Sequence, residues 1–181
     1  MKIINIANII TFFRLFSVPI ILLMILEDKL QIAFWIFLFA SITDIFDGLL
    51  ARKLKIVTEF GNILDPIADK ILIFSVLITL SYKNFIELPI VIIIVLRDFI
   101  IVLGAVLSIL FKKKINYSPL KIGKITFFFQ TVFMGMLLCN YANFFDIEVL
   151  IKYFGLLIIY LTLISGIWYL IIWLKELVVN L

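Results

Sequence analysis

Long apolar runs separated by short polar stretches recur along the whole chain. Segments such as PIILLMIL and PIVIIIVL show no alternation of apolar and polar positions, which argues against strands and a β-barrel. A run of about 20 apolar residues can cross a hydrocarbon core of about 30 Å as a helix. The pattern predicts an all-α integral membrane protein with six spans, at residues 8–26, 31–51, 63–82, 86–110, 122–140 and 147–174.

The composition supports a membrane protein, since 65% of the 181 residues are hydrophobic, against about half in soluble domains. No repeat, linker or separate soluble segment stands out, so residues 1–181 are expected to form a single membrane domain. The first run follows no signal-peptide pattern and contains Arg14. We therefore expect it to be retained as a span.

Basic residues concentrate in the second and fourth predicted loops. They are Arg52, Lys53 and Lys55 in the second, and Lys112, Lys113, Lys114 and Lys121 in the fourth. Because Lys and Arg are enriched in cytoplasmic loops, both termini are predicted to be cytoplasmic. The formal charge of +4 favours contact with anionic lipids and not with nucleic acid.

The chain has one cysteine and no histidine. An intramolecular disulfide is therefore impossible, and Cys139, within an apolar run, is interpreted as a buried, inert thiol. Phe127, Phe128, Phe129, Trp168 and Trp173 are interpreted as lipid-facing or interfacial. Carboxylates, Lys, Arg and hydroxyl groups are left to carry any chemistry.

Four aspartates flank the second predicted loop. Asp44 and Asp47 are three residues apart, which puts both carboxylates on one helix face. Asp65 and Asp69 are four apart on the next helix, with the same consequence. Four carboxylates at one depth are costly in a membrane unless cations neutralise them. Oxygen ligands without His or Cys favour hard ions, so the aspartates predict two divalent cations, Mg²⁺, Mn²⁺ or Ca²⁺.

Two other interpretations of the aspartates stay open from the residues alone. The carboxylates could pair with neighbouring basic residues at the membrane surface or cap helices, and Asp65 before Pro66 has the pattern of an N-cap. The basic residues concerned are Arg52, Lys53 and Lys70. Intramembrane aspartates on two helices would also suit a non-enzymatic cation carrier.

The aspartates belong to a longer motif. Asp44-x-x-Asp47-Gly48-x-x-Ala51-Arg52, eight further residues and then Gly61-x-x-x-Asp65-x-x-x-Asp69 resembles the complete signature of the CDP-alcohol phosphatidyltransferases. The amino-terminal segment is also similar to that family, with Asn8, Thr11 and Arg14 retained and Ala7 where proline is usual. The resemblance extends over nearly the whole chain.

The resemblance implies the family's six-helix fold and its reaction. An alcohol attacks the phosphate of CDP-diacylglycerol, CMP leaves, and two metal ions about 3.5 to 4 Å apart polarise the pyrophosphate. It implies metal ligands at Asp44, Asp47, Asp65 and Asp69, with Asp69 also the general base. It implies CDP contacts at Asn8, Thr11, Arg14, Gly48, Ala51, Arg52 and Gly61. For Arg14, extension of the side chain to the cytoplasmic surface is the alternative.

The resemblance leaves two candidate acceptor alcohols, glycerol 3-phosphate and phosphatidylglycerol. Enzymes using glycerol 3-phosphate typically have a further arginine eight residues after the one on the fourth helix, and Gly-Lys-x-Lys-Thr on the fifth. This chain has Ala105 and Thr126 at the two cation positions. On that basis phosphatidylglycerol, the acceptor of cardiolipin synthases, is the expected acceptor, and glycerol 3-phosphate is the alternative.

Three basic residues are the candidates for binding the acceptor phosphate: Arg97, Lys121 and Lys124. For the lysines the alternative is contact with anionic lipids, and for Arg97 a buried pair with Asp98. Lys112, Lys113 and Lys114 are assigned to topology. The resemblance further implies a homodimer, and the overall expectation is a bacterial inner-membrane enzyme whose site faces the cytoplasm.

Overall fold

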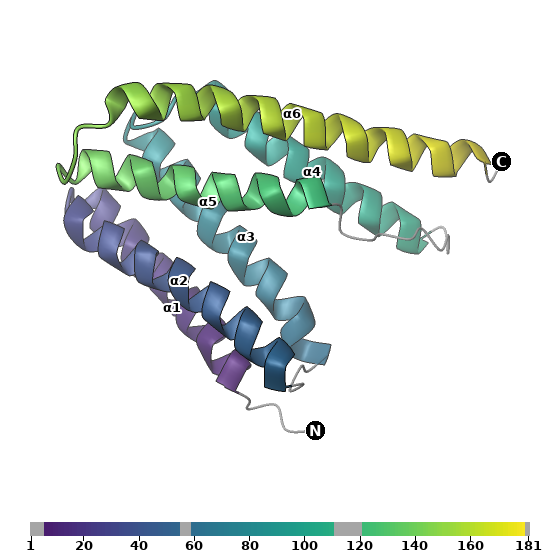
Figure 1. The fold of residues 1–181 in the computed structure, drawn as a ribbon, viewed down its shortest axis with the longest axis horizontal. Coiled ribbons are helices and arrows are strands. Elements are labelled where there is room, and N and C mark those ends of the chain that lie inside the picture. The colour runs from purple at the N-terminus through teal and green to yellow at the C-terminus, as the bar shows by residue number, and fades with distance from the viewer. Residues whose placement is uncertain (1–5, 55–58, 111–120, 180–181) are drawn as a thin grey trace. The chain divides into compact units, whose positions relative to one another are not determined.

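The computed structural model describes the backbone of residues 6–54, 59–110 and 121–179, and side chains within residues 11–43, 67–104 and 122–172. This part of the chain contains only α-helices as regular elements (Figure 1). They are α1 (Ile6–Leu26), α2 (Leu30–Leu54), α3 (Glu59–Tyr82), α4 (Leu88–Leu110), α5 (Lys121–Tyr141) and α6 (Glu148–Val179). The predicted all-α class and six helices are confirmed, with the largest differences at the start of α3 and the end of α6.

The early start of α3 corrects one interpretation. Because the helix begins at Glu59, Asp65 and Pro66 lie inside it, and Asp65 is not an N-cap. Membrane-type helices tolerate an internal proline, since neighbouring groups satisfy the freed carbonyl. The same applies to Pro19 within α1.

One compact unit consists of α1, α2, α3 and residues 134–147. In it, α1 packs against both α2 and α3. The buried face of α1 repeats every three or four residues, as expected for a helix with one packed side; it carries Thr11, Arg14, Val18, Ile21 and Ile25. Ala33 and Ala40 of α2 and Ala68 of α3 are also buried. These small side chains allow the helices to approach closely.

A second compact unit consists of residues 87–133 and 148–181. In it, α4 packs against α6. The apolar core of this unit includes Ile94, Phe133 and Ile158. At Gly155 of α6 a Cβ atom would lie 3.6 Å from the Phe133 ring. The division into two units does not test whether residues 1–181 form a single domain, which remains a prediction.

Three helices end in the same way. Asp28, Asn84 and Asn143 follow α1, α3 and α5 with positive φ angles of 59°, 60° and 59°. The next amide donates to a carbonyl five residues back, as from Lys29 to Met24 at 2.8 Å. Asp and Asn tolerate this left-handed conformation, which satisfies the last carbonyls of a helix. The residue type at each of these positions therefore suits the turn that ends the helix.

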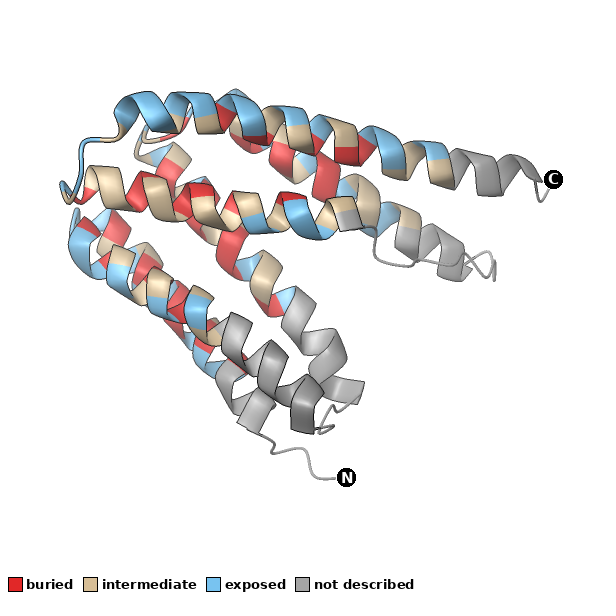
Figure 2. Cartoon of the chain, in the orientation of Figure 1, coloured by how far each residue is buried: buried red, intermediate tan, exposed pale blue. Residues whose placement is uncertain are grey.

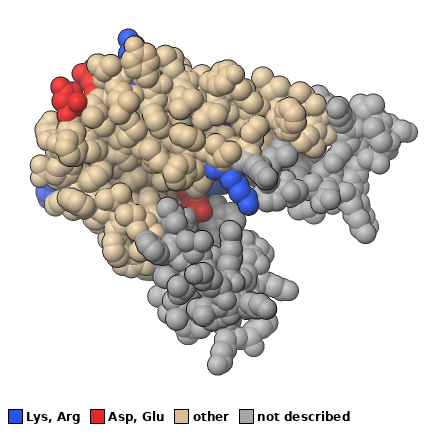
Figure 3. Space-filling view, in the orientation of Figure 1, with Lys and Arg blue, Asp and Glu red and all other residues tan. Residues whose placement is uncertain are grey.

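The described surface is strongly apolar. Figure 2 shows exposed residues along the helices as well as in the loops, and they include Phe16, Trp35, Phe128, Tyr153 and Trp168. On the face drawn in Figure 3, few of the described atoms belong to charged side chains. So much exposed apolar area is typical of a surface that contacts lipid. Phe128 and Trp168 thus fit their lipid-facing interpretation.

Two helices in the described part of the chain are long and apolar enough to span a membrane: Ile122–Tyr141 and Glu148–Ile172. Shorter apolar helices cover Thr11–Leu26 and Leu30–Thr43. The six predicted spans are thus supported in part, and the orientation remains a prediction. Cys139 is half-buried and not fully buried as expected, because it lies in the last turn of α5.

Candidate active site

The four aspartates lie on the two helices that flank residues 55–58. Those four residues limit the distance between the joined helix ends to about 18 Å. With a rise of 1.5 Å per residue, Asp47 and Asp44 lie about 10 and 15 Å before the end of α2. Asp65 and Asp69 lie about 9 and 15 Å after the start of α3. The backbone therefore places both pairs at matching distances from the connection.

Asp69 is the one signature aspartate whose side chain is described, and it forms an ion pair with Arg14 of α1. The Arg14 Nη1 group donates to Asp69 Oδ1. The arginine side chain is 1% exposed and the aspartate side chain 23% exposed. Ser17 Oγ donates to the Arg14 carbonyl at 2.7 Å, within the same turn of α1. A buried cation and a half-buried carboxylate thus neutralise each other between α1 and α3.

The burial of Arg14 excludes the interpretation that its side chain extends to the membrane surface. Its guanidinium lies on the packed face of α1, together with the buried hydroxyl-bearing residue Thr11. A charged group buried in a helix pair is stable when an opposite charge accompanies it. The sequence analysis named Lys70, Arg52 and Lys53 as basic partners of the aspartates and missed Arg14 in this role.

The remaining signature residues are described by their backbone only. Asn8 lies in α1, and Gly61 and Asp65 lie in α3. Those in α2 are Asp44, Asp47, Gly48, Ala51 and Arg52. Their predicted contacts with metal or CDP fall on side chains outside the described ones and stay predictions. Among the described side chains, no group of three metal-ligating residues is present.

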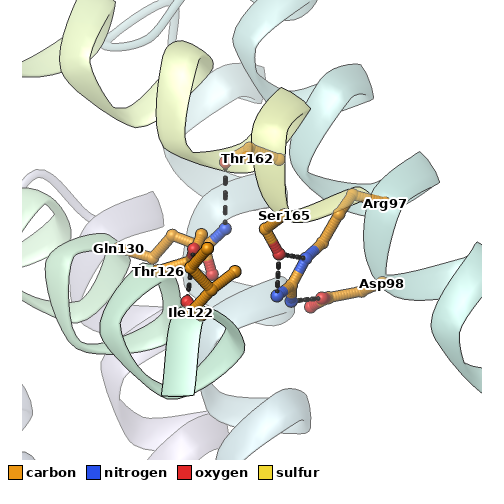
Figure 4. Close-up of polar contacts among 7 residues, drawn as sticks. All are labelled: Arg97, Asp98, Ile122, Thr126, Gln130, Thr162 and Ser165. Carbon is orange, nitrogen blue, oxygen red and sulfur yellow. Dashed lines mark hydrogen bonds and ion pairs between the residues drawn. The ribbon is translucent and has the colours of Figure 1, made fainter. Parts of the chain in front are cut away.

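Arg97 and its neighbours form a second polar cluster, drawn in Figure 4, within the unit that contains α4 and α6. Arg97 is 7% exposed and Asp98 3% exposed. Arg97 Nη1 donates to Asp98 Oδ1. Arg97 Nε and Nη2 both donate to Ser165 Oγ, at 3.0 and 2.6 Å. The buried pair with Asp98, given above as the alternative to acceptor binding by Arg97, is present, and Ser165 of α6 contacts Arg97 as well.

One aromatic residue and two glycines also lie next to Arg97. Its guanidinium carbon lies 5.8 Å from the ring centroid of Tyr169, a distance at which a cation is attracted to the ring. A Cβ at Gly166 would lie 3.4 Å from Arg97 Cγ. A Cβ at Gly123 would lie 3.3 Å from Arg97 Nη2 and 2.8 Å from the Tyr169 hydroxyl. Both glycines therefore make room for this arginine.

Polar side chains of α5 face α6 in the same unit (Figure 4). Gln130 Nε2 donates to Thr162 Oγ1 at 3.5 Å, and both residues are fully buried. Thr126 is buried, and its hydroxyl donates to the Ile122 carbonyl at 2.9 Å. Thr126 stands where a lysine was expected for a phosphate monoester, and its hydroxyl is engaged within its own helix.

The two candidate lysines occupy the start of α5. Lys124 is exposed in the second unit, which leaves its ammonium group accessible. Lys121 is the first residue of α5, and its side chain is outside the described ones. Ala105 lies in α4, again with backbone only. The structure thus brings none of these residues into a described contact with Arg97.

The sequence analysis missed Ser165, Tyr169 and Gly123. A signal was available on α6: Thr162, Ser165 and Tyr169 recur at intervals of three and four in an otherwise apolar helix. Such spacing puts the three side chains on one face. Polar groups at membrane depth usually face protein and not lipid. Gly123 is part of the GKIT segment, in which Lys124 carries the more obvious functional signal.

The chain matches the family model described as CDP-alcohol phosphatidyltransferase over residues 4–174. A protein of Rickettsia felis named CDP-diacylglycerol–glycerol-3-phosphate 3-phosphatidyltransferase is 35% identical over 138 residues, which cover 74% of this chain and 75% of that protein. A protein of the same name from Aquifex aeolicus is 32% identical, covering 81% of both chains.

A relative with a different name aligns with a smaller part of this chain than the two relatives above. A fusion protein of Schizosaccharomyces pombe, named as a CMP-forming cardiolipin synthase joined to a mitochondrial hydrolase, is 36% identical over 101 residues. The aligned part is 56% of this chain and 17% of that protein.

Proposed function

The chain belongs to the CDP-alcohol phosphatidyltransferase family, and on that premise we propose that it transfers the phosphatidyl group of CDP-diacylglycerol to glycerol 3-phosphate. The products are phosphatidylglycerophosphate and CMP. The observation that carries the proposal is that relatives named for this reaction align with about three quarters to four fifths of both chains. Since the family consists of transferases, the alternative of a cation carrier is set aside.

The preference for phosphatidylglycerol is not supported by these comparisons. It rested on Ala105 and Thr126, which lack the expected cations. The relative named as a cardiolipin synthase aligns with 56% of this chain, against 74% and 81% for the Rickettsia felis and Aquifex aeolicus relatives named for glycerol 3-phosphate. An arginine on α4 remains available for a phosphate group, and α5 begins with two lysines. These three cations suit a phosphate monoester or a diester, so the support for glycerol 3-phosphate comes from the names of the relatives.

The reaction follows from the proposed roles of this chain's residues. Asp69 accepts the proton of the acceptor hydroxyl while that oxygen attacks the phosphorus that carries diacylglycerol. The bond from this phosphorus to the oxygen shared with CMP breaks, and CMP leaves with that oxygen. Arg14 holds the Asp69 carboxylate in place through the pair described above. The acceptor phosphate is bound by Arg97, Lys121 and Lys124.

A divalent metal fits the donor set, since all four signature aspartates offer hard oxygen ligands at matching distances along α2 and α3. Asp44, Asp47, Asp65 and Asp69 would hold two ions of Mg²⁺ or Mn²⁺. When bound, the ions would polarise the pyrophosphate and stabilise the charge that develops on CMP. Asn8, Thr11, Gly48, Ala51, Arg52 and Gly61 would contact the CDP group.

The proposed setting is a bacterial inner membrane, crossed six times with both termini and the site on the cytoplasmic side. The proposed orientation is supported by the concentration of Lys and Arg in the second and fourth connections. Homodimerisation is part of the proposal by family likeness.

The test is an acceptor panel with the purified protein in detergent, CDP-diacylglycerol and Mg²⁺. Glycerol 3-phosphate and phosphatidylglycerol are supplied separately, and the lipid products are identified by mass. We expect phosphatidylglycerophosphate together with an equal amount of CMP. Cardiolipin as the dominant product would overturn the choice of acceptor while leaving the reaction class intact.

A further inference from the structure

The guanidinium of Arg97 is held by its neighbours but not saturated by them. A guanidinium carries five N–H groups. Three contacts are described: one from Nη1 to Asp98, and one each from Nε and Nη2 to Ser165. One N–H on each terminal nitrogen therefore has no protein partner among the described residues. For a side chain that is 7% exposed, unused charged donors are costly unless a ligand uses them.

The neighbours of Arg97 differ in the charge that they bring to the cluster. Asp98 neutralises Arg97 through one terminal nitrogen, whereas Ser165 accepts from two nitrogens without adding charge. Because Nε and Nη2 lie along one edge of the planar group, a single oxygen bonded to both fixes the plane of the guanidinium. The Tyr169 ring at 5.8 Å lies against it. Ser165 thus orients the Arg97 guanidinium, and Asp98 neutralises its charge.

Gly123 keeps space free at the same terminal nitrogen. An added Cβ would lie 3.3 Å from Arg97 Nη2 and 2.8 Å from the Tyr169 hydroxyl. Both of these atoms are the far ends of flexible side chains, so a methyl group could be accommodated only by moving them. The orientation of Arg97 therefore depends on two independent features, the hydroxyl on α6 and the missing side chain on α5.

From this geometry we infer that Ser165 is a positioning residue for acceptor binding: it holds Arg97 so that the two remaining N–H groups bind the phosphate of the acceptor. Gly123 is the second determinant, because it leaves Arg97 in that orientation. The inference rests on the proposed function for the identity of the acceptor. It concerns the phosphate group, which glycerol 3-phosphate and phosphatidylglycerol both carry.

Thr162 offers a matched control for Ser165. It lies one turn earlier on α6, is equally buried, and contacts Gln130 and not Arg97. Both Ser165→Ala and Thr162→Ala remove one buried hydroxyl from the same helix. A merely structural effect would be similar in the two variants, whereas loss of orientation would be confined to Ser165.

The experiment measures kcat and both KM values for the full-length protein in detergent with Mg²⁺. In Ser165→Ala we expect the KM for the acceptor to rise about tenfold, equivalent to about 1.4 kcal/mol, with the KM for CDP-diacylglycerol unchanged. Ser165→Thr, which keeps the hydroxyl, should restore most of the acceptor affinity. Thr162→Ala should keep both KM values. An unchanged acceptor KM in Ser165→Ala, or an equal rise in Thr162→Ala, would overturn the inference.

A second pair of variants keeps the test decisive if Ser165→Ala does not fold. Gly123→Ala should raise the KM for the acceptor in the same way. Gly135→Ala, where a Cβ would meet only Phe37 at 3.8 Å, should not. Normal acceptor KM in Gly123→Ala would contradict the inference.

Failure of the proposed function can be distinguished from failure of this inference, because a wrong acceptor is already seen in the products of the wild-type protein. If the wild type uses phosphatidylglycerol, the variants are measured with that lipid as the varied acceptor. The predicted KM changes then apply to its phosphodiester.

Discussion

Arg14 of α1 and Asp69 of α3 form an ion pair across two packed helices, 55 residues apart in the sequence. The pair joins a residue assigned to CDP binding with the residue assigned as general base. Arg14 is almost fully buried, whereas the Asp69 side chain is 23% exposed while its Oδ1 atom contacts the arginine. The arginine can therefore orient the carboxylate while that carboxylate takes part in catalysis.

Loss of Arg14 is expected to lower both stability and turnover. In Arg14→Gln, Asp69 keeps its charge but loses its ion pair with Arg14. Removing one member of a fully buried pair costs about 3 to 5 kcal/mol, and partial exposure of Asp69 reduces the expected cost to about 2 kcal/mol. The measurement is the apparent melting temperature in detergent, together with CMP release.

A double-mutant cycle tests whether the ion pair between Arg14 and Asp69 accounts for the loss of stability. Arg14→Gln combined with Asp69→Asn should recover most of the stability lost in Arg14→Gln, because the carboxylate that Arg14 neutralises is removed as well, yet it should stay inactive. If the double variant is as unstable as the sum of the two single variants, the stabilising role of Arg14 does not act through Asp69.

Neutralising Asp69 alone should abolish the reaction. Asp69→Asn has nearly the same shape but cannot accept the proton of the acceptor, so we expect CMP release to fall about a thousandfold. Asp28→Asn, a change of the same type at a residue with a positive φ that asparagine tolerates, is the control and should keep normal turnover. More than about a tenth of wild-type activity in Asp69→Asn would contradict the assignment of a general base.

The helices were predictable because each is a long apolar run bounded by polar turn residues. Ends with a local signal were predicted well, as at Asp28 and Asn84, where a left-handed residue closes the helix. The start of α3 was not, because the Asp65–Pro66 pair carries an N-cap pattern that the upstream helical turns override. Local preference is a weak guide where a helix is stabilised by its packing.

The site was predictable to the extent that its residues form a contiguous motif. The aspartates on α2 and α3 are close in sequence, and their spacing alone indicates a shared face. Two of the contacts come from other helices: Ser165, which contacts Arg97, is 68 residues from it, and Arg14 is 55 residues from Asp69. Such pairs depend on which helices pack together, and a single sequence does not carry that information.

Removal of divalent metal should stop turnover without unfolding the protein. The four aspartates are proposed to hold two cations, whereas the described core of the first unit is apolar apart from the α1 residues named above. With EDTA we expect CMP release to fall to background and to return on addition of Mg²⁺ or Mn²⁺. The control is the helical circular dichroism signal, which should be retained. Full activity after exhaustive chelation would argue against metal dependence.

The proposed orientation is tested by labelling from each side of the membrane. A cysteine at Thr58, which lies outside the described residues, should react with an impermeant maleimide only from the cytoplasmic side, in a Cys139→Ser background. A cysteine at Phe145, which is exposed between α5 and α6, should react only from the opposite side. These outcomes follow from six crossings with a cytoplasmic amino terminus. Labelling of both sites from one side would contradict the topology.

Replacing Gln130 by methionine is expected to maintain or raise stability. Gln130 is fully buried, its only described hydrogen bond is the long one to Thr162, and its Oε1 atom has no partner among the described residues. An unsatisfied buried acceptor costs about 1 to 3 kcal/mol, so an apolar side chain of similar length should gain about 1 kcal/mol.

The measurement is the apparent melting temperature in detergent, with Gln31→Met as control. Gln31 is exposed and donates to the Ala142 carbonyl at 3.4 Å, so its replacement should change the free energy of unfolding by less than about 0.5 kcal/mol. A fall of melting temperature in Gln130→Met alone would show that the amide oxygen has a partner when the protein is in detergent. Repeating the measurement with saturating acceptor would then reveal whether that partner is the substrate, because a ligand that binds only the folded state raises its stability.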